Sequence, residues 1–173
     1  MNKYKQKMKI LEGYCVVPAK PEVAYKEYIK NLEYEIGCEI PSDYLTFIFN
    51  YSGFAFNDVV YNFYNSSEED DKQLLSVCFG ILPGNGYDLI INYRTFKSRI
   101  PFNFLPIACD AFGNLLCLSV IGEDKGYVYF WLHDAEETIG EKPSKYPEDI
   151  HLVSKSFDEF INSLHKYEED DDE

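Results

Sequence analysis

The chain has 173 residues, a formal net charge of −14 at pH 7 and 46% hydrophobic residues, a composition that suits one globular domain with a full core. The acidity argues against nucleic acid or an anionic membrane as a partner, because both would repel a negative surface. No apolar run approaches the ~20 residues of a membrane-spanning helix, and no signal-peptide core follows the first lysines, so we expect a soluble, cytoplasmic protein.

The two ends of the chain differ in composition from the middle. Residues 1–20 are basic and polar, and the sequence predicts that they are loosely attached to the fold. A single domain is expected over residues 21–166. Residues 167–173 are nearly all acidic, and because such a run buries no apolar surface, the sequence predicts a disordered tail.

Two helices are predicted in the first third of the chain. Between residues 22 and 36 the apolar side chains recur with the spacing of one helix face, and Gly37 follows at the position of a terminating glycine. A second helix is expected to begin at Ser42 and Asp43, whose side-chain oxygens can accept hydrogen bonds from free backbone amides, and to end before Gly53.

Two strands and a third helix are expected next. Segments 59–64 and 74–82 predict strands, and the polar, acidic stretch between them predicts an exposed loop. Asp88 is predicted to cap a helix that continues to about Lys97. Residues 83–86 lack the lysine and the spacing of a phosphate-binding loop, so we interpret their glycines as a strand-to-helix turn.

The centre of the chain predicts a β-hairpin, because two apolar runs flank the turn-forming residues 110–114. A third strand at 127–132 extends the hairpin to an antiparallel meander over about residues 105–132. An acidic loop then leads to a last helix, where Ser156 and Glu159 match a capping box. The order of elements predicts an α+β fold, in which a mostly antiparallel sheet packs against N-terminal and C-terminal helices.

The residue patterns favour no enzyme or metal site. His133 precedes Asp134, but neighbours on a strand point to opposite faces, so a polar pair at the surface explains them better than a catalytic pair. Asp110 is interpreted as capping its own turn, since the spacing of a calcium loop is absent. The five cysteines contain no C-x-x-C pair and predict inert free thiols. We therefore expect no cofactor, no metal and no catalysis.

Acidic segments are the remaining functional candidates, because together they could steer a basic protein toward this chain. They cover residues 68–71, 123–124 and 134–141, and the single tryptophan lies near the last of them, although a core position is favoured for it. The candidate partner-binding residues are Glu68, Glu69, Asp70, Asp71, Glu123, Asp124, Trp131, Asp134, Glu136 and Glu137.

Several short motifs follow one another along the chain. The first is Ile40-Pro41-Ser42-Asp43-Tyr44, and the second is Leu105-Pro106-Ile107-Ala108 with Gly113-Asn114. The third is Val128-Tyr129-Phe130-Trp131 with His133, and the last is Ser156-Phe157-Asp158-Glu159-Phe160. Their order resembles the SUKH superfamily (SMI/KNR-type domain) over about residues 22–165. Asn50-Tyr51-Ser52-Gly53 departs from the Asn-Gly-Gly turn of the family, since only its last glycine matches.

The resemblance implies a non-catalytic α+β domain, and many bacterial members are immunity proteins. We therefore hypothesise an immunity protein that binds and neutralises a cognate, basic toxin, of the nuclease class, in a bacterial polymorphic toxin system. One alternative is a regulatory or scaffolding interaction domain related to cell-wall synthesis regulators. The other is a small-molecule module or enzyme with a pocket between sheet and helices. The sequence specifies neither the toxin nor the oligomeric state.

Overall fold

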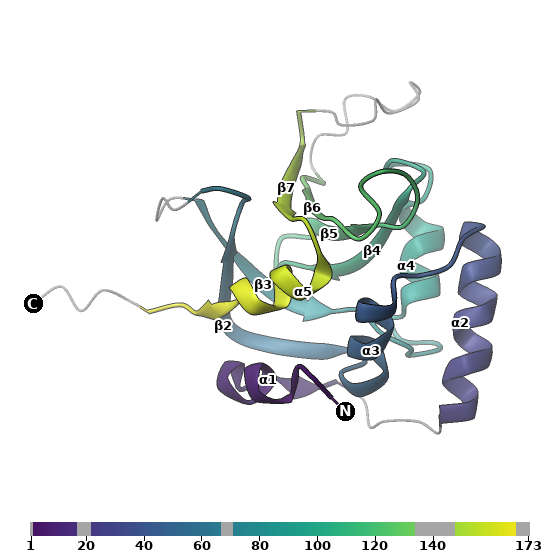
Figure 1. Cartoon of the computed structure of the whole chain (residues 1–173), viewed down its shortest axis with the longest axis horizontal. Helices are drawn as coiled ribbons and strands as arrows, with labels where there is room; N and C mark the ends of the chain where they lie inside the picture. Colours follow the sequence, from purple (N-terminus) through teal and green to yellow (C-terminus); the bar gives the residue numbers. More distant parts are fainter. Residues whose placement is uncertain (1, 17–21, 67–70, 134–147, 169–173) are drawn as a thin grey trace, which may run out of the picture.

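The computed structural model describes residues 2–16, 22–66, 71–133 and 148–168, and it shows a curled antiparallel sheet with helices packed against it (Figure 1). Within these ranges the strand order is β1-β2-β3-β4-β5-β6-β7, with β8 paired to β2, which confirms the predicted α+β class. The elements are α1 (Lys5–Leu11), β1 (Tyr14–Cys15), α2 (Glu22–Ile36), α3 (Ser42–Asn50), β2 (Phe54–Asn62), β3 (Lys72–Cys78), α4 (Leu89–Phe96), β4 (Phe104–Cys109), β5 (Leu115–Ser119), β6 (Val128–Trp131), β7 (Ile150–Ser154), α5 (Phe157–Ser163) and β8 (His165–Lys166).

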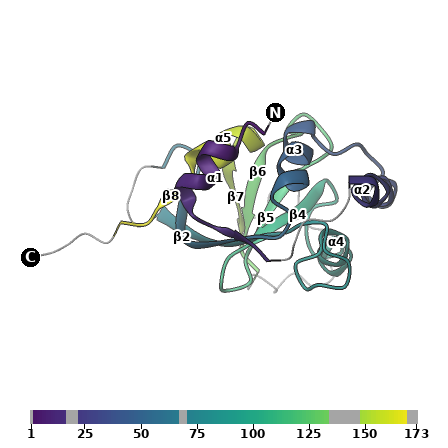
Figure 2. The same cartoon turned by 90° about the horizontal axis from the view of Figure 1, so that it is seen from below.

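Helices cover the sheet in two groups. Figure 2 shows α1, α3 and α5 gathered over one face, with α2 and α4 side by side at one flank. In the first group, Phe160 of α5 packs edge-on against Tyr61 of β2, with ring centroids 5.8 Å apart. In the second, Phe96 of α4 meets Trp131 of β6 at 6.1 Å. The central strands β4, β5 and β6 are buried at nearly every position, the pattern of strands that are covered on both faces.

The predicted central hairpin is confirmed as β4 and β5, and β6 completes the meander. Asp110 closes the turn, because its carboxylate accepts hydrogen bonds from the backbone amides of Phe112 (2.8 Å) and Asn114 (2.9 Å). Gly113 adopts a φ of 90°, a left-handed conformation that a residue with a Cβ rarely takes. The turn-capping interpretation of Asp110 is therefore confirmed.

The other strands differ from the prediction in length and number. β2 begins at Phe54 instead of residue 59, and its register with β3 shifts between Ala55 and Val59, where Asp58 has a φ of 53°. A bulge of this kind interrupts the alternation that identifies a strand in sequence. β7 is missing from the prediction: the sequence predicts a loop over residues 133–150 and no element between that loop and the last helix, because the pairing of β7 with β6 leaves no local signal.

The predicted caps of α2, α4 and α5 are present, but the predicted side-chain cap of α3 is wrong: its N-cap residue is Pro41, and neither Ser42 nor Asp43 caps the helix. α2 covers the predicted residues, and Gly37 follows it with a φ of 75°. At α5, Ser156 Oγ accepts a hydrogen bond from the Glu159 amide (3.1 Å), while the Glu159 carboxylate accepts from the Lys155 amide (3.1 Å), one residue earlier than in a standard capping box. Across the described ranges, no helix combines the length and apolarity needed to cross a membrane.

The basic N-terminal segment packs against the core, which corrects the expectation of a loose attachment. Tyr4, Met8 and Leu11 are spaced as one helix face and are buried beneath α1. The lysines that alternate with them mask this apolar stripe in the sequence. Lys3 adds an ion pair to Asp158 of α5, with 2.7 Å between Nζ and Oδ2. The domain boundaries at residues 21 and 166 stay a prediction.

One buried hydroxyl of this core has no hydrogen-bond partner among the residues that the structure describes. Tyr44 is 1% exposed, burial raises the pKa of its hydroxyl, and its ring packs edge-on against Phe157 at 5.0 Å. Tyr44→Phe keeps the ring and removes the unsatisfied group, so we expect the free energy of unfolding to rise by about 1 kcal/mol. Urea denaturation measures it, and an unchanged or lower midpoint would contradict the expectation.

Candidate interaction surface

Four of the ten predicted contact residues lie in the described part of the chain, and two of these four are at the surface. Asp71 is partly exposed at the start of β3 and accepts a hydrogen bond from Ser66 Oγ. Glu123 is exposed in the connection between β5 and β6. Six fall outside the described residues: Glu68, Glu69, Asp70, Asp134, Glu136 and Glu137.

The other two, Asp124 and Trp131, are interior residues, which corrects their prediction as direct contacts. Asp124 is 8% exposed, and its carboxylate accepts hydrogen bonds from Ser119 Oγ (3.1 Å) and the Tyr129 hydroxyl (2.8 Å). Trp131 is 7% exposed and packs beneath α4, the core position that the sequence favours. Both side chains hold the sheet and its turns together, so neither is available to a partner.

Glu123 lies away from the turn 110–114. The turn 110–114 precedes β5 and the connection with Glu123 follows it, so these two loops lie at opposite strand ends. The 134–141 segment begins after His133, whose backbone amide donates to Asn114 Oδ1 at 3.0 Å. His133 therefore lies at the 110–114 end of the sheet, away from Glu123.

Three described segments form what we call the acidic rim: residues 110–114, 132–133 and 148–149. The Leu132 amide donates to the Asp149 carbonyl at 3.0 Å, and the bond from His133 to Asn114 joins the turn to both. These segments hold three carboxylates and no lysine or arginine. The acidic rim therefore brings three carboxylates to one end of the sheet.

The β2–β3 hairpin is attached beside this rim through β7. The Tyr64 amide donates to the Leu152 carbonyl at 2.8 Å, and the Phe63 ring stacks on His151 with centroids 4.9 Å apart. Because β7 starts directly after the rim, the hairpin that carries Asp71 is joined to the same part of the fold.

Sequence reasoning missed Phe112, which lies in the turn of the acidic rim and is 78% exposed. The one local signal is a large aromatic residue in the middle of a turn otherwise built from small and polar residues. Exposure alone does not mark a contact, because Phe102 and Tyr34 are at least as exposed, so Phe112 becomes a candidate through its position in the acidic rim.

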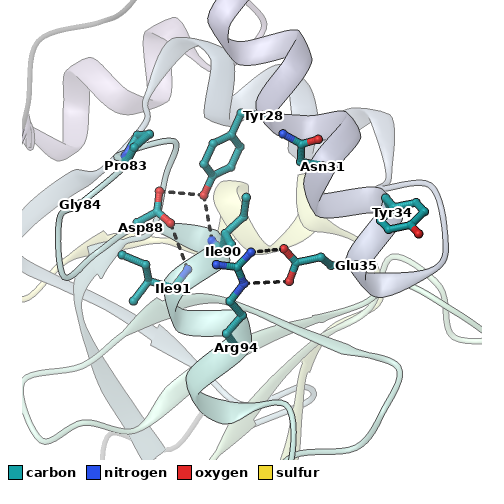
Figure 3. A pocket seen from close by; sticks show the side chains of 10 residues that line it. All are labelled: Tyr28, Asn31, Tyr34, Glu35, Pro83, Gly84, Asp88, Ile90, Ile91 and Arg94. Carbon is teal, nitrogen blue, oxygen red and sulfur yellow. Dashed lines mark hydrogen bonds and ion pairs between the residues drawn. The ribbon is translucent and has the colours of Figure 1, made fainter.

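A separate hollow of about 510 Å³ lies between α2 and α4 (Figure 3). Its polar groups bind one another. The Tyr28 hydroxyl donates to Asp88 Oδ2 (2.8 Å) and accepts from the Ile90 amide (2.8 Å), while the Arg94 guanidinium pairs with Glu35. The pKa of Glu35 is lowered by its hydrogen bond to Arg94, and burial raises the pKa of Tyr28. These bonds join α2 to α4, so the polar groups that line the hollow are explained by the packing of the two helices and need no ligand.

Asp88 is the centre of this lock, and its removal should destabilise the fold. The side chain is 2% exposed, and besides Tyr28 it accepts hydrogen bonds from the amides of Ile91 (3.0 Å) and Leu82 (3.1 Å). Asp88→Ala leaves these donors unpaired and removes the cap of α4, so we expect a loss of about 2 kcal/mol in urea denaturation. Asp88→Asn keeps one capping oxygen and should lose less; equal losses for both variants would contradict this role.

The three cysteines that lie in β3, β4 and β5 agree with the prediction of inert thiols, whereas Cys15 is exposed and Cys38 is partly exposed. Cys78 and Cys117 are buried, and burial raises the pKa of both. Burial also raises the pKa of Cys109 to about 11, so its thiolate is scarce at neutral pH. Within the described ranges, no group of three or more His, Cys, Asp or Glu residues is placed to hold a metal ion.

Comparisons with known proteins find relatives over most of the chain. The model of the SMI1/KNR4 family (SUKH-1) matches residues 24–163, which include the acidic rim and the α2–α4 hollow. The chain is also similar to the SPbeta prophage-derived uncharacterized protein YokK of Bacillus subtilis (strain 168). The two are 32% identical over 158 residues, which cover 83% of this chain and 76% of that protein.

Proposed function

This chain belongs to the SMI1/KNR4 family (SUKH-1), which includes toxin immunity proteins, and we propose that it is an immunity protein. In this proposal it binds and neutralises a cognate toxin, of the nuclease class, in a bacterial polymorphic toxin system. Proteins of the family are generally non-catalytic, so the proposed action is binding alone. A cytoplasmic location, as the sequence predicts, would place it where an incoming nuclease acts.

The observation that carries this proposal is the family match in a chain with a net charge of −14. A nuclease must hold anionic phosphates, so its substrate groove is basic. An acidic protein is attracted to such a groove over long distances and competes there with nucleic acid. Electrostatic complementarity therefore supports neutralisation by covering the substrate groove.

We propose that the contact lies on the acidic rim and the acidic segments connected to it. Glu123 lies at the opposite end of the sheet and is a weaker candidate, and the buried Asp124 and Trp131 are left out. The predicted residues that remain are Glu68, Glu69, Asp70 and Asp71 in the β2–β3 connection, and Asp134, Glu136 and Glu137 in the β6–β7 connection.

The test is a growth assay with the proteins encoded by the genes next to the gene of this chain. Each is expressed in a bacterial host, alone and together with this chain. We expect one of them to arrest growth and this chain to restore it. The proposal fails if this chain rescues none of them and binds none at micromolar concentration. Recovery of cell-wall synthesis proteins in a pull-down, without a toxin, would instead favour a regulatory domain.

A further inference from the structure

We infer that Phe112 is the apolar anchor by which the acidic rim docks on a basic protein that offers a pocket for an aromatic ring. This inference rests on the proposed function and identifies the part of the surface that would perform it. Interfaces are enriched in aromatic residues, and a few buried anchors of this kind carry most of the binding energy.

The turn holds Phe112 in place before any partner arrives. Both oxygens of Asp110 are used within the turn, where they accept from the Phe112 amide and from the backbone (2.9 Å) and side-chain (2.7 Å) nitrogens of Asn114. Asn114 Oδ1 accepts in turn from the His133 amide, which ties the turn to β6. A backbone fixed in this way loses little entropy on binding, so more of the contact energy appears as affinity.

The carboxylates of the acidic rim favour a basic partner. Asp110 lies two residues away from Phe112, and Glu148 and Asp149 belong to the neighbouring segment of the acidic rim. The rim segments themselves contain no lysine or arginine, and the cation nearest to them in the described contacts, Arg99, packs over the ring of the buried Trp131. A partner surface with lysines and arginines around an apolar pocket would match both the ring and its surroundings.

Two other described aromatic side chains are as exposed as Phe112, and both lack these surroundings. Phe102 is 80% exposed, but the shallow hollow that it borders is also lined by Lys97, which would repel a basic partner. Tyr34 is 89% exposed beside Glu35, whose charge is paired with Arg94. Of these three most exposed rings, Phe112 is therefore the one that best fits the partner that the net charge favours.

Phe112→Ala and Phe102→Ala form a matched pair for the test, because both remove an exposed phenylalanine ring. The probe is the toxin that the wild-type chain neutralises in the growth assay, and its dissociation constant is measured by calorimetry. We expect Phe112→Ala to weaken binding at least ~30-fold and to lose protection, and Phe102→Ala to change binding less than ~3-fold. Phe112→Tyr, which keeps the ring, should bind like the wild type.

The outcomes separate the docking surface from the function. If the wild-type chain binds the toxin and Phe112→Ala binds as tightly, the anchor is refuted and the proposed function stands. If Phe102→Ala or Tyr34→Ala loses binding instead, docking lies on the α2–α4 flank and the inference is wrong. If the wild-type chain binds no toxin, both proposals fail. Thermal unfolding of Phe112→Ala should match the wild type, which excludes misfolding as the cause of a loss.

Discussion

Gly80→Ala should lower the free energy of unfolding by about 3 kcal/mol, because no side chain fits at this position. A Cβ on Gly80 would lie 2.2 Å from the backbone nitrogen of Gly53 and 2.7 Å from the carbonyl carbon of Ser52. These are backbone atoms, so they cannot rotate away as the end of a flexible side chain can. The substitution must move one of two chain segments.

Backbone hydrogen bonds also fix Gly80 on its other side, so its backbone cannot shift away from the contact without losing them. Its amide donates to the Tyr87 carbonyl (3.0 Å), and its carbonyl accepts from the Leu89 amide (2.9 Å). The next amide, that of Ile81, donates to Ser52 Oγ. Any shift that relieves the contact therefore breaks bonds that join the start of α4 to the turn between α3 and β2.

Gly86→Ala is the matched control for this prediction. No atom lies within 4 Å of a Cβ built on Gly86, and its backbone is outside the left-handed region. We expect this variant to keep or slightly raise stability, because alanine restricts the unfolded chain. Urea denaturation of both variants decides the matter: if Gly80→Ala unfolds at the wild-type midpoint, the close approach of the two backbones is refuted.

Local patterns explain what the sequence predicts of this fold. α2 has a regular apolar face and a terminating glycine, so its bounds follow from its own residues. The β4–β5 hairpin is set by the capping group of Asp110 and by the left-handed conformation of Gly113, both of which lie inside the turn. In each case the signal and the structure share one short stretch of chain.

Contacts between distant segments explain what the sequence does not predict. β7 exists through its pairing with β6, and α1 is fixed through Tyr4, Met8 and Leu11, whose partners lie far along the chain. The position of the acidic rim likewise depends on contacts between distant segments. Its charges are visible in the sequence, but the bond from His133 to Asn114, which joins its segments, depends on the sheet. Composition thus identifies the charge of the candidate site, and topology gives its position.

Phe157→Ala is expected to have the largest effect on stability, a loss of about 4 kcal/mol. Phe157 is the first residue of α5 and is 0% exposed. Four rings surround it at centroid distances of 5.0 Å (Tyr44), 5.2 Å (Phe47), 6.0 Å (Phe160) and 6.1 Å (Tyr4). These rings are held by α3, by α5 and by the residue before α1, so they cannot all move into the space of the removed ring. Truncation therefore leaves a cavity. The loss is a large part of the 5–15 kcal/mol that is typical of a domain.

The same substitution at an exposed site provides the control, because Phe102→Ala removes an identical ring that is 80% exposed and should change stability by less than about 0.5 kcal/mol. Similar losses for both variants would contradict the aromatic cluster.

Amide hydrogen exchange then tests the N-terminal segment directly. Tyr4, the residue directly before α1, packs against Phe157. The α1 amides should therefore be protected from exchange in the wild type and exchange faster in Phe157→Ala. If the segment were loosely attached, the α1 amides would exchange rapidly in both proteins and the substitution would leave their rates unchanged.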